Sequence, residues 1–307
     1  MKAKIRTFLE IFFFIIILSI IISKIDISKL GNILSTMDYS WILLGISIYC
    51  VSIIITAYGL KALFDAIKYT SFKEWIKLFL MSFSLGLVLP GRAGDLSIIY
   101  FTKEKSFDIG QSTALTIIDK LITLIIFGCI AAIGIFTLLS SEELYWGLLA
   151  TGIAIIGGLS LFSSIGRTII KRIIGKYAEK FKGFNKTFKD LLKYHKDKIA
   201  INIFITLLRP IGNALLMIFI LKAMGVEVPF TYVVLINAIT LIASLIPLTP
   251  SGIGIRESIG AFLFTKIGVA LEISLSMYLI ILMMNYATAI VGVSYYWLSK
   301  KTNNSLS

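Results

Sequence analysis

The sequence predicts an all-α, polytopic membrane protein with about six full transmembrane helices and two re-entrant or broken helix pairs. Hydrophobic residues make up 57% of the 307 residues and charged residues only 15%, whereas roughly 25% of the residues of soluble domains are charged. The mean hydropathy is +0.92, and much of the chain consists of apolar runs close to the roughly 20 residues that a membrane-spanning helix needs. These observations exclude an ordinary soluble protein and predict a single membrane domain over residues 1–307.

Six apolar runs are long enough to cross a bilayer. The first, at 8–25, is long and is followed by no Ala-x-Ala cleavage site, so we interpret it as a span rather than as a cleaved signal peptide. The other five runs cover about 41–64, 114–138, 146–165, 199–222 and 274–298. Each run is predicted to form one transmembrane helix.

Two further apolar segments, 76–99 and 232–264, are interrupted by proline- and glycine-rich sequences, LPGRAGD at 89–95 and PLTPSGIGIRES at 247–258. Non-helical backbone at membrane depth is tolerated only where it contacts protein or lines a water-filled cavity. Each segment is therefore predicted to be a re-entrant or broken helix pair that enters and leaves the membrane on one side. With six full crossings, both termini then lie on the same face.

The distribution of positive charge predicts the orientation. The net charge is +13, and 22 of the 30 Lys and Arg residues lie in segments that are cytoplasmic if the N-terminus is inside. Only four lie in the outer segments, which is the asymmetry of the positive-inside rule. We therefore expect a multi-pass protein of the cytoplasmic (cell) membrane with both termini in the cytoplasm.

One cytoplasmic loop, 166–198, is strongly basic. It holds 11 of the Lys and Arg residues, interleaved with Phe and Tyr. Such a segment beside a membrane is more typical of an amphipathic helix on anionic lipid than of a nucleic-acid-binding surface. The predicted partner of this loop is an anionic lipid surface, and no nucleic acid is expected.

The two halves of the sequence share a spacing. In residues 1–145 the second span begins about 49 residues before Pro90, and in residues 146–307 its counterpart begins about 51 residues before Pro250. The next span begins about 24 residues after each proline. Because the same elements start from opposite sides of the membrane, the halves are predicted to be inverted-topology repeats, whose broken helices meet near the midplane.

Seven ionisable residues fall at membrane depth: Arg92, Asp95, Asp119, Lys120, Arg209, Arg256 and Glu257. A charge at the centre of a lipid-exposed helix costs roughly 2.5 to 3.5 kcal/mol on insertion scales. We therefore expect these side chains to face the protein interior. There they either pair and lock the repeats together or line a polar cavity that binds an anionic substrate, and the two roles are compatible.

Several of these residues have a structural alternative to substrate binding. Arg209 precedes Pro210, so its guanidinium could satisfy the backbone carbonyl that the proline leaves free. Lys120 lies near the cytoplasmic end of its span and could extend toward the membrane surface. Arg256 and Glu257 are adjacent and cannot face each other on a helix, so each is expected to find a partner elsewhere.

Proline and glycine define the two breaks. The residues are Pro90, Gly91 and Gly94 in the first break, and Pro250, Gly252 and Gly254 in the second. Glycine permits tight turns and close backbone approach, and a helix that begins at such a break presents free N–H groups to phosphate or carboxylate. Neither break has the G-x-x-x-x-G-K-[ST] pattern of a nucleotide-binding loop.

Residues for metal or nucleophilic chemistry are scarce. The chain has two cysteines, Cys50 and Cys129, which both lie in apolar runs, and a single histidine, His195, in the basic loop. This composition excludes a disulfide framework and histidine-based metal or triad chemistry. We expect no metal, no cofactor, no catalytic residues and no enzymatic activity.

At these motifs the sequence resembles a flippase-like family of membrane proteins that includes the transmembrane region of lysylphosphatidylglycerol synthases. The resemblance covers nearly the whole chain and is carried by PGRAGD, the later Asp119–Lys120 pair, and SLIPLTPSGIGIRES followed by KIGV. The family pattern P-G-R-x-G-E matches Pro90, Gly91, Arg92, Gly94 and Asp95, with Asp in place of Glu, and the pattern P-x-G-I-G-x-R-E matches Pro250, Gly252, Ile253, Gly254, Arg256 and Glu257. Ile98 stands where the family usually has an arginine, and Lys120 stands for the arginine of the later acidic–basic pair. The cytosolic aminoacyl-transfer domain of the synthases has no counterpart, so the resemblance implies the membrane fold and not their lipid-modifying reaction.

Three functions remain open on these observations. The favoured one is a lipid flippase or exporter that moves an anionic or glycosylated lipid through the charged midplane cavity. An inverted repeat is equally typical of a secondary transporter for a small solute. The third is a membrane accessory subunit or transferase in lipid or glycolipid synthesis, which is less favoured because no soluble segment exceeds about 32 residues.

Overall fold

The computed structural model describes residues 35–88, 93–140, 145, 152, 183–245, 249 and 251–304, and the structural statements below concern these residues. Their regular secondary structure is helical, without strands. Four of the helices are long and apolar enough to cross a membrane: α3 (Tyr39–Phe64), α6 (Ile109–Leu138), α10 (Lys196–Ala223) and α13 (Leu271–Asn304). They confirm four of the six predicted spans. The predicted spans 8–25 and 146–165 lie outside the described residues, apart from residue 152.

Both predicted broken helix pairs are present. In the first, α4 (Phe72–Val88) is followed by the short helices η1 (Ala93–Ser97), α5 (Ile98–Phe101) and η2 (Thr102–Lys105). η1 and α5 pack back against α4, so the chain reverses direction at the break. In the second, α11 (Phe230–Ala243) and α12 (Ile255–Lys266) pack against each other across the segment that contains Gly252 and Gly254.

Local signals in the sequence fix where these helices begin. The Asp38 carboxylate accepts a hydrogen bond of 3.0 Å from the backbone N–H of Ser40 and caps α3. A hydrogen bond from the Ser40 hydroxyl, together with this backbone bond, lowers the pKa of Asp38. At the start of α6, the side chain of Gln111 accepts a hydrogen bond of 3.1 Å from the backbone N–H of Asp108, as one half of a capping box. Gly254 has a φ of 88° at the start of α12, a conformation that only glycine adopts readily.

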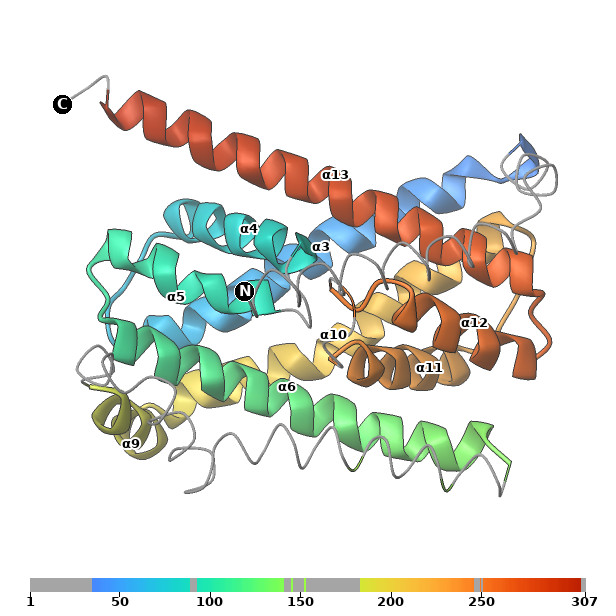
Figure 1. Cartoon of the computed structure of the whole chain (residues 1–307), viewed down its shortest axis with the longest axis horizontal. Coiled ribbons are helices and arrows are strands. Elements are labelled where there is room, and N and C mark those ends of the chain that lie inside the picture. Colours follow the sequence, from blue (N-terminus) through green and yellow to red (C-terminus); the bar gives the residue numbers. More distant parts are fainter. Residues whose placement is uncertain are drawn as a thin grey trace, which may run out of the picture.

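The helices pack in pairs that are consistent with the predicted repeat (Figure 1). α3 packs along α10 at the centre, α4 packs along α13, and α6 packs along α11. If the predicted halves correspond, α3 is the counterpart of α10, α4 of α11, and α6 of α13. The α4–α13 contact is then the counterpart of the α11–α6 contact, which is the exchange of partners that a two-fold relation produces.

The residues that meet where α3 crosses α10 also agree with the spacing of the predicted repeat. Pro90 and Pro250 are 160 residues apart, and so are Ser52 and Gly212. Ser52 and Gly212 meet at this crossing, where a Cβ atom on Gly212 would lie 2.5 Å from Ser52 Oγ. Two equivalent residues that face each other are expected on a two-fold axis. The repeat itself stays a prediction, since part of each half lies outside the described residues.

The basic loop contributes helix α9 (Phe184–Tyr194). Leu191 is buried and Phe188 packs beside it in the hydrophobic core between α3, α4 and α6, while Lys186, Lys189 and Lys193 are exposed. The predicted amphipathic helix is therefore present, but these two apolar side chains contact the helix bundle and do not point to lipid. Residues 166–182 of the loop lie outside the described residues, and binding of anionic lipid by the exposed lysines stays a prediction.

Candidate functional site

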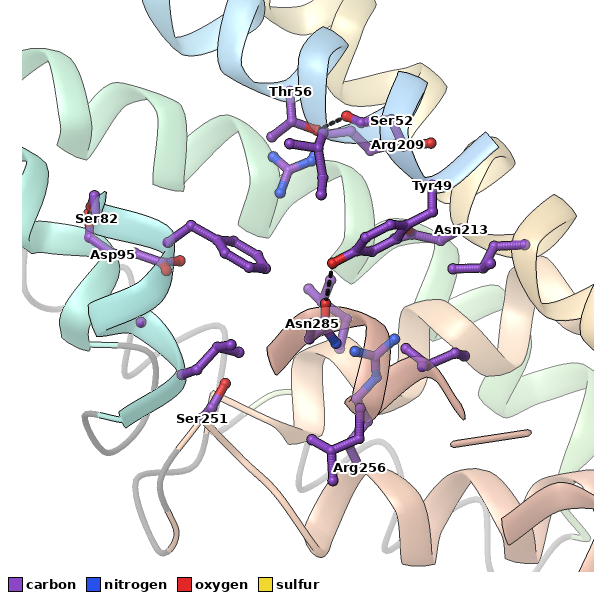
Figure 2. Close-up of a pocket in the computed structure, with 18 of the residues that line it drawn as sticks. Tyr49, Ser52, Thr56, Ser82, Asp95, Arg209, Asn213, Ser251, Arg256 and Asn285 are labelled. Atoms are coloured by element: carbon purple, nitrogen blue, oxygen red, sulfur yellow. Dashed lines mark hydrogen bonds between the residues drawn. The ribbon is translucent and has the colours of Figure 1, made fainter. Parts of the chain in front are cut away.

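A cavity of about 190 Å³ lies where the two broken helix pairs approach α3, α6, α10 and α13 (Figure 2). Six of the seven predicted charged residues line it: Asp95, Asp119, Lys120, Arg209, Arg256 and Glu257. Arg92 lies outside the described residues, as do Pro90, Gly91 and Pro250. The structure thus brings together charges that are spread over more than half of the sequence.

The first break supplies one wall of the cavity, where an ion pair joins η1 to α6. Lys120 Nζ lies 3.1 Å from Asp95 Oδ2 and 3.8 Å from an oxygen of the neighbouring Asp119. Lys120 therefore binds Asp95 and does not extend toward the membrane surface, the alternative that the sequence left open. The other carboxylate oxygen of Asp119 accepts a hydrogen bond of 3.0 Å from Asn202 Nδ2, which also donates to the carbonyl of Gly59 at 3.0 Å.

Close packing explains why glycine occupies the first break. A Cβ atom on Gly94 would overlap the backbone of Leu85 in α4, so only glycine lets η1 approach α4 this closely. The Ser82 hydroxyl of α4 donates a hydrogen bond of 3.2 Å to the carbonyl of Asp95. These contacts fix the backbone of Asp95 and direct its carboxylate to the cavity.

Arg209 enters the cavity from α10. Its guanidinium donates a hydrogen bond of 3.0 Å to Thr123 Oγ1 on α6 and lies 5.9 Å from the ring of Phe127. α10 continues through Pro210 as a single helix, and the hydrogen bond of Arg209 goes to another helix, not to a carbonyl of its own. Among the described residues Arg209 forms no ion pair.

Arg256 and Glu257 lie in the first turn of α12, at the second break. One carboxylate oxygen of Glu257 accepts a hydrogen bond of 2.5 Å from the backbone N–H of Gly254, so the helix N-terminus is the partner of this acid. The guanidinium of Arg256 lies 6.0 Å from the ring of Tyr278 and points into the cavity in Figure 2. Its Nε is buried without a hydrogen-bond partner, and no carboxylate in the described part of the chain pairs with it.

Several uncharged polar residues of the site were missed by the sequence analysis. Tyr49 of α3 donates a hydrogen bond of 2.8 Å to Asn285 Oδ1 of α13, between the two arginines (Figure 2). Asn213 and Ser251 also line the cavity, and Asn202 lies behind Asp119. An Asn within an apolar span was the available signal, because polar side chains in such helices usually face a protein partner.

The charges of the cavity balance formally but are unevenly paired. Among the described residues, three cations face three carboxylates: Lys120 is paired with Asp95 and lies 3.8 Å from Asp119, and Glu257 is bound by the α12 N-terminus. Arg209 and Arg256 are left as positively charged hydrogen-bond donors with no acidic partner in these ranges. Within this part of the chain no group of three His, Cys, Asp or Glu side chains could hold a metal ion. The arrangement is suited to binding an anion.

Comparison with known proteins identifies a family. The family model of the lysylphosphatidylglycerol synthase TM region matches residues 7–292, which include both breaks and every residue that lines the cavity. No curated protein and no solved structure matches the chain.

Proposed function

Since the chain belongs to the family of the lysylphosphatidylglycerol synthase TM region and is a multi-pass integral membrane protein, we propose that it is a lipid flippase or exporter. Its substrate is an anionic or glycosylated lipid of the cytoplasmic membrane. The headgroup passes through the charged cavity while the acyl chains stay in the bilayer. In the membrane orientation that the positive-inside rule predicts, both termini and the basic loop 166–198 face the cytoplasm.

One observation carries the proposal: Arg209 and Arg256 face the same cavity, and neither has an ion-pair partner in the described part of the chain. Charged residues within a membrane are rare because burying them is costly, and they usually mark a substrate or ion pathway. A guanidinium matches phosphate or carboxylate with two parallel hydrogen bonds. An anionic headgroup would supply the negatively charged partner that these two arginines lack among the described residues.

The remaining polar residues fit the uncharged part of a headgroup. Tyr49, Asn213 and Asn285 supply hydroxyl and amide groups to the cavity, which can exchange hydrogen bonds with glycerol or sugar hydroxyls. The cavity of about 190 Å³ is somewhat larger than the roughly 150 Å³ engineered cavity that binds a benzene molecule. It is therefore suited to one small headgroup in this conformation.

The test is a lipid-translocation assay with purified full-length protein in proteoliposomes. Dithionite quenching would follow the movement of fluorescent phosphatidylglycerol and of a fluorescent monoglycosyl lipid between leaflets. Arg209→Gln and Arg256→Gln should each reduce the rate at limiting lipid ten- to hundredfold, because a hydrogen bond to a charged group contributes about 1.5 to 3 kcal/mol. Arg92→Gln should behave in the same way if the first break contributes equally.

Lys222→Gln is the matched control. Lys222 lies in the last turn of α10, on the same helix as Arg209 but outside the cavity. It should insert, fold and transport like the wild type. Normal transport by stable Arg209→Gln and Arg256→Gln proteins would overturn the headgroup role.

The same vesicles separate the alternatives. Uptake of free glycerol phosphate without movement of any lipid would identify a small-solute transporter. An increase in lipid mass on addition of an activated donor would identify a transferase, and the family is compatible with such a role in lipid synthesis. The proposed flippase should move the tail-bearing lipid and leave its mass unchanged.

A further inference from the structure

The second break contains a backbone conformation that serine rarely adopts. Ser251 has a φ of 52°, in the left-handed region, where among the described residues the other non-glycine is Ser106, with a φ of 63°. A Cβ atom is disfavoured there, and glycine is the residue that occupies this region without penalty. The position that follows the proline of the first break is a glycine, Gly91, whereas the position that follows Pro250 is Ser251.

The hydroxyl of Ser251 is not bonded to the described residues of the turn that holds it. Ser251 lines the cavity and its oxygen points into it (Figure 2). No hydrogen bond joins this hydroxyl to any other residue that the structure describes. Two other hydroxyls of the cavity are used within the protein: Thr56 Oγ1 donates to the carbonyl of Ser52 at 2.7 Å, and Ser82 Oγ to that of Asp95. The Ser52 hydroxyl has no partner among the described residues either, but its backbone is regular α-helix.

A strained residue with an unused polar group that faces a cavity indicates a functional constraint at that position. The constraint is not on the backbone, because glycine would satisfy the turn better. It is not on an internal hydrogen bond, because the described residues provide none. What remains is the hydroxyl group that Ser251 presents to the cavity.

The second break also holds the unsatisfied donor of the site. Arg256 follows Ser251 by five residues in the sequence, and its Nε has no hydrogen-bond partner among the described residues. At the first break, by contrast, Asp95 is held by Lys120. The second break therefore offers an outside ligand two groups, the Ser251 hydroxyl and the Arg256 guanidinium, in addition to Arg209 on α10.

We propose that Ser251 is a specificity-determining residue that donates a hydrogen bond to an anionic oxygen of the same headgroup that Arg256 binds. This inference rests on the proposed function and assigns the anionic part of the lipid to the second break. The Ser251 hydroxyl favours headgroups that carry an acceptor oxygen beside their negative charge. The energetic penalty of the left-handed serine is retained because glycine cannot supply this donor.

Three substitutions separate the hydroxyl from the backbone. Ser251→Ala removes the donor and keeps the strain. Ser251→Gly removes the donor and relieves the strain, whereas Ser251→Thr keeps the donor and increases the strain, because β-branched residues are least tolerated at positive φ. Each full-length variant would be tested for thermal stability and for the translocation of fluorescent phosphatidylglycerol over a range of lipid fractions.

The inference predicts that stability and transport change independently. Ser251→Ala and Ser251→Gly should each raise the lipid fraction for half-maximal transport about 10- to 100-fold. The melting temperature of Ser251→Gly should nevertheless equal or exceed that of the wild type. Ser251→Thr should melt lower and keep an affinity close to that of the wild type. Ser106→Gly is the matched control, because Ser106 has the same backbone conformation but is exposed outside the cavity, so its transport should be unchanged.

The outcomes distinguish the role of Ser251 from the proposed function. If the wild type moves lipid and Ser251→Gly moves it with unchanged affinity, the role of Ser251 is overturned and the proposed function stands. If the wild type moves no lipid under conditions in which it is folded, the proposed function is overturned and the role of Ser251 with it. If Ser251→Thr loses affinity as fully as Ser251→Gly while remaining folded, the hydroxyl is not the recognised group and the inference also fails.

Discussion

Lys120 of α6 lies 3.1 Å from the carboxylate of Asp95, at the point where the first break reaches the cavity. This pair ties a short segment after the break to the middle of a long membrane helix. It also keeps a lysine and an aspartate from attracting other ions into the cavity. We assign the pair a structural role, in contrast to Arg209 and Arg256.

The first prediction tests this pair by a double-mutant cycle. Lys120→Gln and Asp95→Asn should each lower the melting temperature. Lys120→Gln removes the cation that faces Asp95 and Asp119, and Asp95→Asn leaves Lys120 with only the more distant Asp119 at 3.8 Å. The double variant should be more stable than the sum of the single effects predicts, with a coupling energy of about 1 kcal/mol, a modest value because both side chains are partly exposed to the cavity. Thermal unfolding in the same detergent measures all four proteins. Additive effects would show that the two side chains do not stabilise each other.

The second prediction concerns Asn202, which is buried with 1% of its surface exposed. Its amide donates to both the Asp119 carboxylate and the Gly59 carbonyl. Asn202→Ala leaves the buried Oδ1 of Asp119 without its donor and should destabilise the protein by roughly 1 to 3 kcal/mol. The exposed Asn185 of α9 provides the control, since Asn185→Ala should leave stability unchanged. An unaltered melting temperature for Asn202→Ala would contradict the proposed role of this amide.

The third prediction tests the crossing of α3 and α10. Gly212→Ala places a methyl group against the Ser52 hydroxyl and should destabilise the protein by about 1 kcal/mol, the lower range for overpacking, because a serine hydroxyl can rotate away. In the Ser52→Ala background the nearest remaining atom of residue 52 is its Cβ, at 3.6 Å, an ordinary contact distance. Stability should therefore recover in the double variant. If Gly212→Ala is equally destabilising in both backgrounds, the two residues do not meet as described.

The fourth prediction distinguishes charge from geometry at the two arginines. Arg209→Lys and Arg256→Lys keep the positive charge but lose the planar fork that binds two oxygens at once. Each should transport at a rate between those of the wild type and the Gln variant, with less change in stability than in rate. Equal rates for the Lys and wild-type proteins would mean that only the charge matters.

The fifth prediction concerns topology. Cys50 and Cys129 are both exposed on membrane helices, so they are first replaced by alanine. In this background a cysteine at Asn185 should react with an impermeant maleimide only after cells are opened, and a cysteine at Ser140 should react in intact cells. Labelling of position 185 from outside would reverse the orientation that the positive-inside rule predicts.

The amino-acid sequence was sufficient to predict the class of protein, the four described spans, the two breaks and the charges of the cavity. These features are local, because hydrophobicity over about 20 residues decides membrane insertion and proline or glycine decides where a helix stops. A charged side chain within an apolar helix is costly on a lipid face, so it usually faces the interior of the protein. For this reason the sequence alone predicts an interior position for seven charged residues, and the structure places six of them around one cavity.

Which of these groups find a partner within the protein depends on how the helices pack against one another. Lys120 could have extended to the membrane surface, and Arg209 could have bound its own helix; packing instead directs them to Asp95 and Thr123. The uncharged partners and the left-handed conformation of Ser251 depend on which helix faces meet and on how tightly the chain turns at the second break. The period of a helix shows which residues share a face, but packing against other helices decides what that face contacts.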